Sequence, residues 1–180
     1  MKKKIFTITL FLTFIGVFSQ NLELNNFKIE NNNLIWQKIY ETHYSKTELI
    51  DHFKKSGKIL DIEITENDLT GRLKNLDLDY KGFGKSEMST AIYISRNFLS
   101  SFVLIEFKDG KYRVTLKDLK LAQKYSDALS KEGEISELKD YAVKSNNSDY
   151  KNGFKKEPSE ILNFTFNKVF ENIEKKNDKW

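Results

Sequence analysis

Acidic residues in pairs come closest to a catalytic arrangement in this sequence. Asp61 and Glu63 are two residues apart, and so are Asp77 and Asp79. In a β-strand such residues project from one face, so each pair could share a cation or a sugar, or do acid–base work. Both pairs alternate with leucine and isoleucine, which is also the pattern of a half-exposed strand. Two interpretations stay open: a solvated strand face, and a hydrolase that uses Asp77, Asp79 or Glu87.

Metal and nucleophile chemistry lack their usual residues. The sequence has no cysteine and only two histidines, His43 and His52, whose spacing differs from the i, i+4 spacing of a two-histidine metal face. No serine lies in a GxSxG elbow, and Gly82 and Gly84 are too few for a dinucleotide fingerprint. We therefore predict no catalytic residue, no metal site and no cofactor.

Two other groups of residues could contact a ligand or a partner. Tyr80 and Phe83 belong to the segment YKGFG, where aromatic side chains on flexible backbone could grip a ligand or cover the end of a sheet. Lys108, Lys111 and Arg113 surround the Asp-Gly dipeptide of IEFKDGKYRVTL. Their charge could bind an anion or a partner, or it could be the solvated side of a hairpin.

The hairpin interpretation follows from the pattern around Asp109-Gly110. This dipeptide favours a two-residue type I′ turn, which needs positive φ at both positions. The register that follows places apolar side chains on one face, in the pairs Phe107–Tyr112, Ile105–Val114 and Val103–Leu116. The opposite face has the pairs Glu106–Arg113 and Lys108–Lys111. A cross-strand charge pair contributes about 0.2–1 kcal/mol, so we expect one buried and one solvated face.

A helix is predicted over residues 45–57. Ser45 can cap its N-terminus, Glu48 completes a capping box, and Gly57 is a natural stop. Alternating patterns predict strands elsewhere. The first two strands form a hairpin over 27–41 that turns at Asn31–Asn33. Two more are expected over 60–65 and 76–80, with a turn at 67–71 between them. The last two are expected over 90–95 and 98–107.

A second helix is predicted from Pro158, because proline suits the first helical position. Its apolar residues form one stripe at helical spacing, from Ile161 to Ile173. We expect this stripe to pack on the sheet. The alternative is a helix-mediated assembly in which Phe166, Val169 and Phe170 lie between chains.

The first residues have the features of a secretory signal peptide. A basic start, Lys2–Lys4, precedes an apolar run from Ile5 to Phe18, and cleavage is expected between Ser19 and Gln20. A retained membrane anchor is the alternative, but the run is shorter than the ~20 residues of a spanning helix. We therefore expect export to the periplasm or beyond, with no membrane span in the mature chain.

Removal of this segment also changes the charge. The whole sequence has 30 basic and 26 acidic residues, and the loss of three lysines lowers the formal net charge from +4 to +1. A nearly neutral chain has no net field to gather nucleic acid. We therefore expect no nucleic-acid partner.

Three stretches, LIWQKIYE, ITENDLTGRLKNLDLDYKG and KDGKYRVTL, resemble a domain of unknown function with a TBP-like fold, common in exported proteins of Bacteroidota-type bacteria. The resemblance covers roughly residues 26–121. It implies an α+β fold in which a curved antiparallel β-sheet has helices on one side. It implies no reaction, and it does not transfer DNA binding, because fold does not determine function.

The expected organisation has five parts. These are a signal peptide (1–19), an N-terminal linker (20–25), the TBP-like α+β domain with its capping helix (26–121), a polar and partly mobile connection (122–157) and a C-terminal helix (158–180). The predicted function is that of an exported, non-catalytic binding or structural module of the cell envelope. Its partner would be an envelope protein or a small ligand, on a concave sheet face with YKGFG at the rim.

Overall fold

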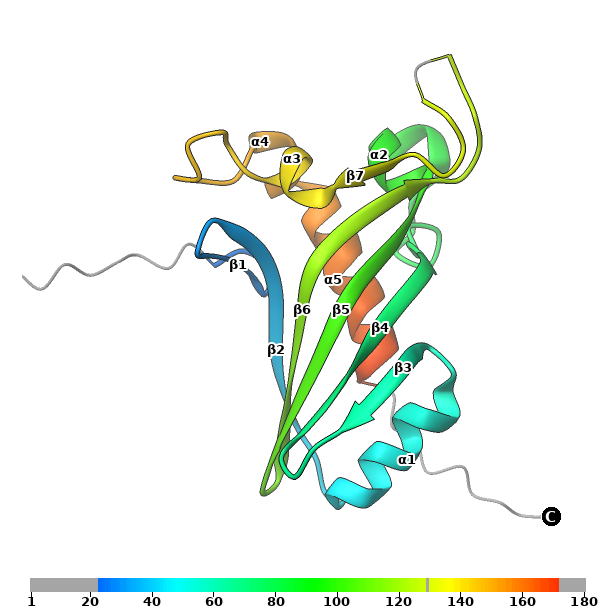
Figure 1. The fold of residues 1–180 in the computed structure, drawn as a ribbon. Helices are drawn as coiled ribbons and strands as arrows, with labels where there is room; N and C mark the ends of the chain where they lie inside the picture. The colour runs from blue at the N-terminus through cyan, green and yellow to red at the C-terminus, as the bar shows by residue number, and fades with distance from the viewer. Residues whose placement is uncertain (1–22, 129, 172–180) are drawn as a thin grey trace, which may run out of the picture.

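The computed structural model describes residues 23–128 and 130–171 (Figure 1), so the expected signal peptide and its cleavage site lie outside the described residues. The elements in chain order are β1 (Phe27–Glu30), β2 (Asn33–Glu41), α1 (Lys46–Ser56), β3 (Ile59–Ile64), β4 (Asp68–Asp77), a 3₁₀ turn (Glu87–Ser89), α2 (Ile92–Ser95), β5 (Asn97–Lys108), β6 (Lys111–Gln123), β7 (Ile135–Glu137), α3 (Leu138–Ala142), α4 (Asn152–Lys155) and α5 (Glu157–Phe170).

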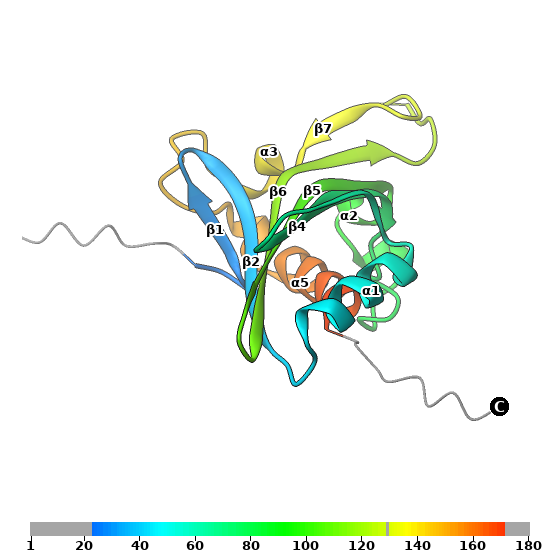
Figure 2. The same cartoon turned by 60° about the horizontal axis from the view of Figure 1, so that its bottom comes forward.

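The strands form one seven-stranded antiparallel sheet. Its order is β1-β2-β6-β5-β4-β3, and β7 pairs with the far end of β6. The sheet bends around α5, as Figure 2 shows, so α5 lies against its concave, inner face. The expected α+β class, with a curved antiparallel sheet and a C-terminal helix, is confirmed. The expectation that the concave face is the contact surface is wrong, because α5 covers that face.

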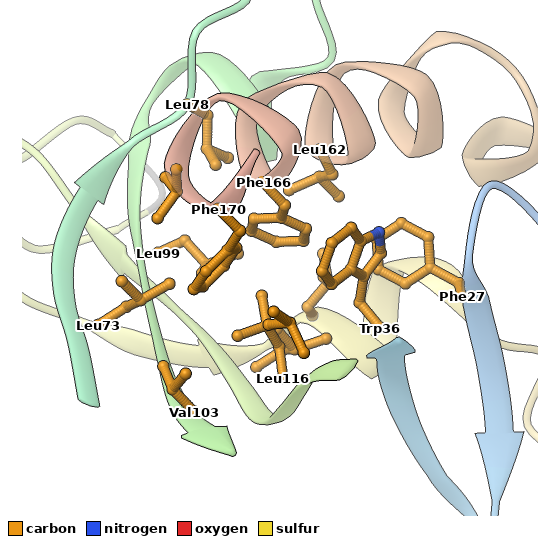
Figure 3. Close-up of a cluster of buried hydrophobic side chains, with 14 of the residues drawn as sticks. Phe27, Trp36, Leu73, Leu78, Leu99, Val103, Leu116, Leu162, Phe166 and Phe170 are labelled. Carbon is orange, nitrogen blue, oxygen red and sulfur yellow. The ribbon is translucent and has the colours of Figure 1, made fainter. Parts of the chain in front are cut away.

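The main core lies between α5 and the inner face of the sheet (Figure 3). Phe166 and Phe170 of α5 contact Trp36 of β2, with ring centroids 5.2 and 6.2 Å apart. The helix begins at Glu157, with Pro158 in its first turn. From Ile161 to Phe170 the expected apolar stripe therefore packs on the sheet, as its helical spacing predicted, and Ile173 lies outside the described residues.

The β5–β6 hairpin has the predicted register. Its apolar pairs are Phe107–Tyr112, Ile105–Val114 and Val103–Leu116, and its charged pairs are Glu106–Arg113 and Lys108–Lys111. The predicted turn type is wrong, because Gly110 has a φ of +72° whereas Asp109 has no positive φ. A type I′ turn does form in the β1–β2 hairpin, where Asn31 and Asn32 have φ of 48° and 63°.

Helix α1 is as predicted. Ser45 and Glu48 form the capping box, and Gly57 ends the helix in the left-handed conformation. The strand predicted over 90–95 is wrong, because residues 92–95 form the single helical turn α2. A short apolar run does not distinguish a strand from a helix by its period.

The turn predicted at 67–71 is also wrong, because β4 already begins at Asp68 and runs through Gly71. A Cβ at Gly71 would lie 2.4 Å from Ile59 Cγ2 and 2.9 Å from Leu60 O. Gly71 therefore lies inside a strand, where the lack of a side chain allows β3 to approach β4 closely. Glycine in a strand can have this role without marking a turn.

The segment expected as a connection contributes β7, α3 and α4. Its second half has several buried side chains, namely Leu138, Ala142, Val143, Tyr150 and Phe154. The Tyr150 hydroxyl donates to the carbonyl oxygen of Phe27 at 2.8 Å, which ties this segment to β1. Among residues 23–128 and 130–171, no helix has the length and apolar character needed to cross a membrane.

Candidate functional site

The tip of the β5–β6 hairpin is positively charged. Lys108 and Lys111 are exposed and face each other beside the turn. Arg113 donates from Nε and Nη2 to the two carboxylate oxygens of Glu106, at 2.6 and 2.5 Å. This double hydrogen bond holds the pKa of Glu106 below its usual range. The charge of Arg113 is thus already engaged, whereas the two lysines have no ion pair within the described part of the chain.

The aromatic residues of YKGFG contact α5. Tyr80 is only 8% exposed, and the ring of Phe83 meets the ring of Phe164 edge to face, with centroids 5.7 Å apart. The backbone N–H of Asp79 also donates to Thr165 Oγ1 at 3.0 Å. This loop therefore covers the helix at one end of the sheet. As direct ligand contacts, Tyr80 and Phe83 stay a prediction.

The structure does not bring the loop and the hairpin tip together. The loop follows Asp77, which pairs with Phe98 near the start of β5, whereas Lys108 ends the same strand. Ten residues of strand at roughly 3.3 Å each separate the two regions by about 33 Å. Figure 1 shows them at opposite ends of the sheet. A single small ligand cannot contact both.

Four of the five acidic residues singled out in the sequence each have a separate basic partner, whereas Glu63 forms no ion pair within the described residues. Asp61 pairs with Lys74, Asp77 with Lys124, Asp79 with Lys168, and Glu87 with Arg96. Hydrogen bonds from Lys168 and from the Gly82 N–H hold the pKa of Asp79 below its usual range. A general acid needs a raised pKa, so this environment does not suit Asp79 for that role.

The two histidines lie apart from these carboxylates, near and on α1. His43 is exposed, and burial together with the charge of Lys58 lowers the pKa of His52. Within the described residues, no group of three or more His, Cys, Asp or Glu side chains could hold a metal ion.

The outer face of the sheet, opposite α5, has a row of residues that the sequence analysis missed. Arg72 of β4 pairs with Phe102 of β5, and Phe102 pairs with Lys117 of β6. Phe102 is half-buried, and both basic residues are exposed. In the part of the chain that the structure describes, neither Arg72 nor Lys117 forms an ion pair. An aromatic ring thus lies between two basic residues.

The sequence shows part of this row, namely its apolar residues. The position of Arg72 in the row depends on how β4 pairs with β5. Phe102 and Leu104 share the strand face of Glu106, which the hairpin pattern marks as solvated. Two large apolar residues on a solvated face are therefore visible from the sequence. The pairing of β5 with β4, however, shifts in register between Leu73 and Leu76, and no local pattern predicts the place of Arg72.

A pocket of about 340 Å³ lies beside this row, between β2 and β6. Its floor is apolar, with Leu34, Ile35 and Leu119, and Lys117 is part of its wall. The remaining lining residues are polar or charged. They are Glu30, Asn31, Asn33, Asp118, Glu137 and Lys139.

Comparison with known proteins gives two similar structures. No protein-family model and no curated protein matches the chain. A TBP-like protein from Parabacteroides distasonis ATCC 8503 has a TM-score of 0.49 and 13% identity, over 79% of this chain and 93% of that chain. A DUF4468 family protein from Bacteroides ovatus ATCC 8483 has a TM-score of 0.41 and 13% identity, over 78% and 85%. One description names a TBP-like protein and the other a DUF4468 family protein, and neither states an activity.

Proposed function

We propose that this chain is an exported, non-catalytic binding module of the cell envelope that holds a protein partner on the outer face of β4, β5 and β6. The inner face is unsuited to this role because the core occupies it. Phe53 of α1 packs on Tyr112 of β6, with ring centroids 5.8 Å apart, so α1 also lies on the inner side. The outer face of the central strands is left as the surface for a partner.

The row Arg72–Phe102–Lys117 is the observation that supports this proposal most directly. Phe102 and its neighbour Leu104 offer partly exposed apolar surface, and such surface favours contact with a protein. The cations on both sides of Phe102 favour a segment that has carboxylates next to an apolar side chain.

The hairpin tip extends this positive surface. Lys108 and Lys111 lie at the end of the same two strands, and Arg113 is on the outer face with Glu106. We keep these three basic residues as expected partner contacts. Charge pairs at the rim of an interface mainly raise the association rate, so their loss should weaken capture less than loss of the central row.

A pull-down with matched variants tests the proposal. Tagged chains that begin at Gln20 are incubated with the envelope fraction of the producing bacterium, and bound proteins are identified by mass spectrometry. The test variant is Arg72→Glu with Lys117→Glu. The control is Lys54→Glu with Lys55→Glu, which changes the net charge equally on exposed positions of α1.

We expect wild type and the α1 control to hold one partner in stoichiometric amount, and the outer-face variant to lose it. Circular dichroism should show the same melting temperature for wild type and the outer-face variant, because Arg72 and Lys117 are exposed. Equal capture by all three chains, or no stoichiometric partner for wild type, would contradict the proposal.

A further inference from the structure

Strand β6 changes its neighbour along its length. Its pairing with β2 ends at Leu116, and its pairing with β7 begins at Lys120. Between these points Lys117, Asp118 and Leu119 have no strand beside them on that edge. Asp118 has a φ of +54°, and the register against β5 shifts here, as expected for an extra residue in a β-bulge.

Strand β2 leaves the sheet at the same level. Its first residues pair only with β1, for example Ile35 with Lys28 and Leu34 with Ile29. Two strand edges therefore face each other across a gap, Asn33–Ile35 on one side and Lys117–Leu119 on the other. We call this space the gap pocket; it is the pocket of about 340 Å³ that Glu137 and Lys139 also line.

The backbone of the gap pocket offers hydrogen bonds. Antiparallel strands direct the N–H and C=O groups of alternate residues to each side, so an unpaired stretch leaves donors and acceptors at its edge. Both walls of the gap pocket are such stretches. An extended chain between them could pair with both edges, as in recognition by strand addition.

The side chains add charges of both signs around an apolar floor. Leu34, Ile35 and Leu119 are each 4% exposed, and Leu34 and Leu119 belong to the main hydrophobic core. Glu30 and Glu137 provide carboxylates that form no ion pair within the described residues, whereas Asp118 meets Lys120 at 3.1 Å. Lys117 and Lys139 provide ammonium groups. A purely anionic ligand would be repelled by the carboxylates, and a purely cationic ligand would be repelled by the ammonium groups. A ligand with both charges could place each charge beside a group of opposite sign.

We propose that the gap pocket binds a short extended peptide with free termini, two or three residues long. Its amides would pair with the two strand edges, its ammonium group would meet Glu30 or Glu137, and its carboxylate would meet Lys117 or Lys139. The volume is at the lower end of the range for small-ligand sites, which suits a ligand of this size. This site shares Lys117 with the partner surface proposed above, but its other lining residues are not part of that surface.

Titration with a dipeptide tests the proposal. Unlabelled Ala-Ala with free termini is added at millimolar concentration to the ¹⁵N-labelled chain from Gln20, and amide shifts are followed by NMR. We expect saturable shifts at residues 33–35, 117–119 and 137–139. The N-acetylated, C-amidated dipeptide should bind about tenfold more weakly, because it lacks both charges.

Two variants and a control locate the site. Lys139→Ser should weaken the binding of Ala-Ala about tenfold, and Asn33→Trp should abolish it by filling the mouth from an exposed position. Lys74→Ser, an equivalent loss of charge on β4, should leave it unchanged. The absence of saturable shifts, equal affinity for the capped dipeptide, or shifts centred on Phe102 in place of the gap pocket would overturn the proposal.

Discussion

Asn163 of α5 accepts a hydrogen bond from the indole of Trp36 on β2, with Oδ1 3.0 Å from Nε1. One helical turn further on, Asn167 accepts from the hydroxyl of Tyr40 at 2.9 Å. Residues four apart on a helix share a face, and so do alternate residues of a strand. The two asparagines therefore fix the position of α5 along β2, in addition to the apolar packing between them.

Replacement of Asn163 by alanine should destabilise the fold by about 1–3 kcal/mol, because Trp36 is fully buried and its N–H would lose its acceptor. Urea unfolding followed by tryptophan fluorescence measures this loss. Glu160→Ala, at an exposed position of the same helix, is the control and should change the unfolding midpoint little. Equal midpoints for the two variants would show that the hydrogen bond has no net effect on stability.

Replacement of Gly71 by alanine should cost about 1–3 kcal/mol, since the new Cβ would overlap Ile59 and the backbone of Leu60. The matched control is Gly153→Ala, because nothing lies within 4 Å of a Cβ at Gly153 and this residue is helical. At Gly153, alanine should leave the free energy of unfolding unchanged or raise it by about 0.5–1 kcal/mol. Thermal melts of both variants measure the difference, and a stable Gly71→Ala chain would mean that β3 can move away from β4.

Asp149 should make stability depend on pH in the acid range. Hydrogen bonds from Lys155 and then Lys144, at 2.8 and 3.0 Å, lower the pKa of Asp149 to about 2 from 3.8. A lowered folded-state pKa contributes stability that is present above the unfolded-state value and lost as the pH falls through the folded-state value.

Asp149→Asn should therefore lower the melting temperature at about pH 7 and have little effect near pH 2. Circular dichroism melts across this range measure the difference between variant and wild type. Asp140→Asn is a suitable comparison, because Asp140 forms no ion pair within the described part of the chain. If the Asp149 difference were the same at both pH values, the two lysines could not be its cause.

Phe166→Ala should destabilise the single chain by about 3–5 kcal/mol, because Phe166 is fully buried between α5 and the sheet. The mass in solution, measured by light scattering after gel filtration, should stay the same. Phe164→Ala, at a half-buried position two residues earlier, should cost less. A lower mass with unchanged stability would support helix-mediated assembly through Phe166, Val169 and Phe170, which α5 otherwise buries in its own chain.

Local signals predicted the elements that depend on neighbouring residues. Asp109-Gly110 was sufficient for the register of β5 with β6, and Ser45 with Glu48 was sufficient for the start of α1. Both features are decided within a few residues. The turn type at Asp109 was nevertheless wrong, which shows that a dipeptide can determine register without determining every φ.

Features that depend on distant partners could not be predicted. Tyr150 lies in a polar segment, yet it is 2% exposed because its hydroxyl reaches Phe27, 123 residues earlier. The row of Arg72, Phe102 and Lys117 joins three strands, and both of its registers contain a shift. The gap pocket results from the change of neighbour along β6. The periodicity of a single strand does not predict a register shift or a change of neighbour, since these are properties of pairs of strands.

The position of α5 in the chain has a consequence for the order of folding. All strands precede α5, and the hydrogen bond from Trp36 to Asn163 joins residues 127 positions apart. While the ribosome makes the chain, the part of the concave face that α5 covers stays open until residues 157–170 have been synthesised. Contacts of such long range form slowly, and the exposed apolar face is open to aggregation in the meantime. Stable tertiary structure should therefore appear only late in synthesis, in one step, when the helix docks.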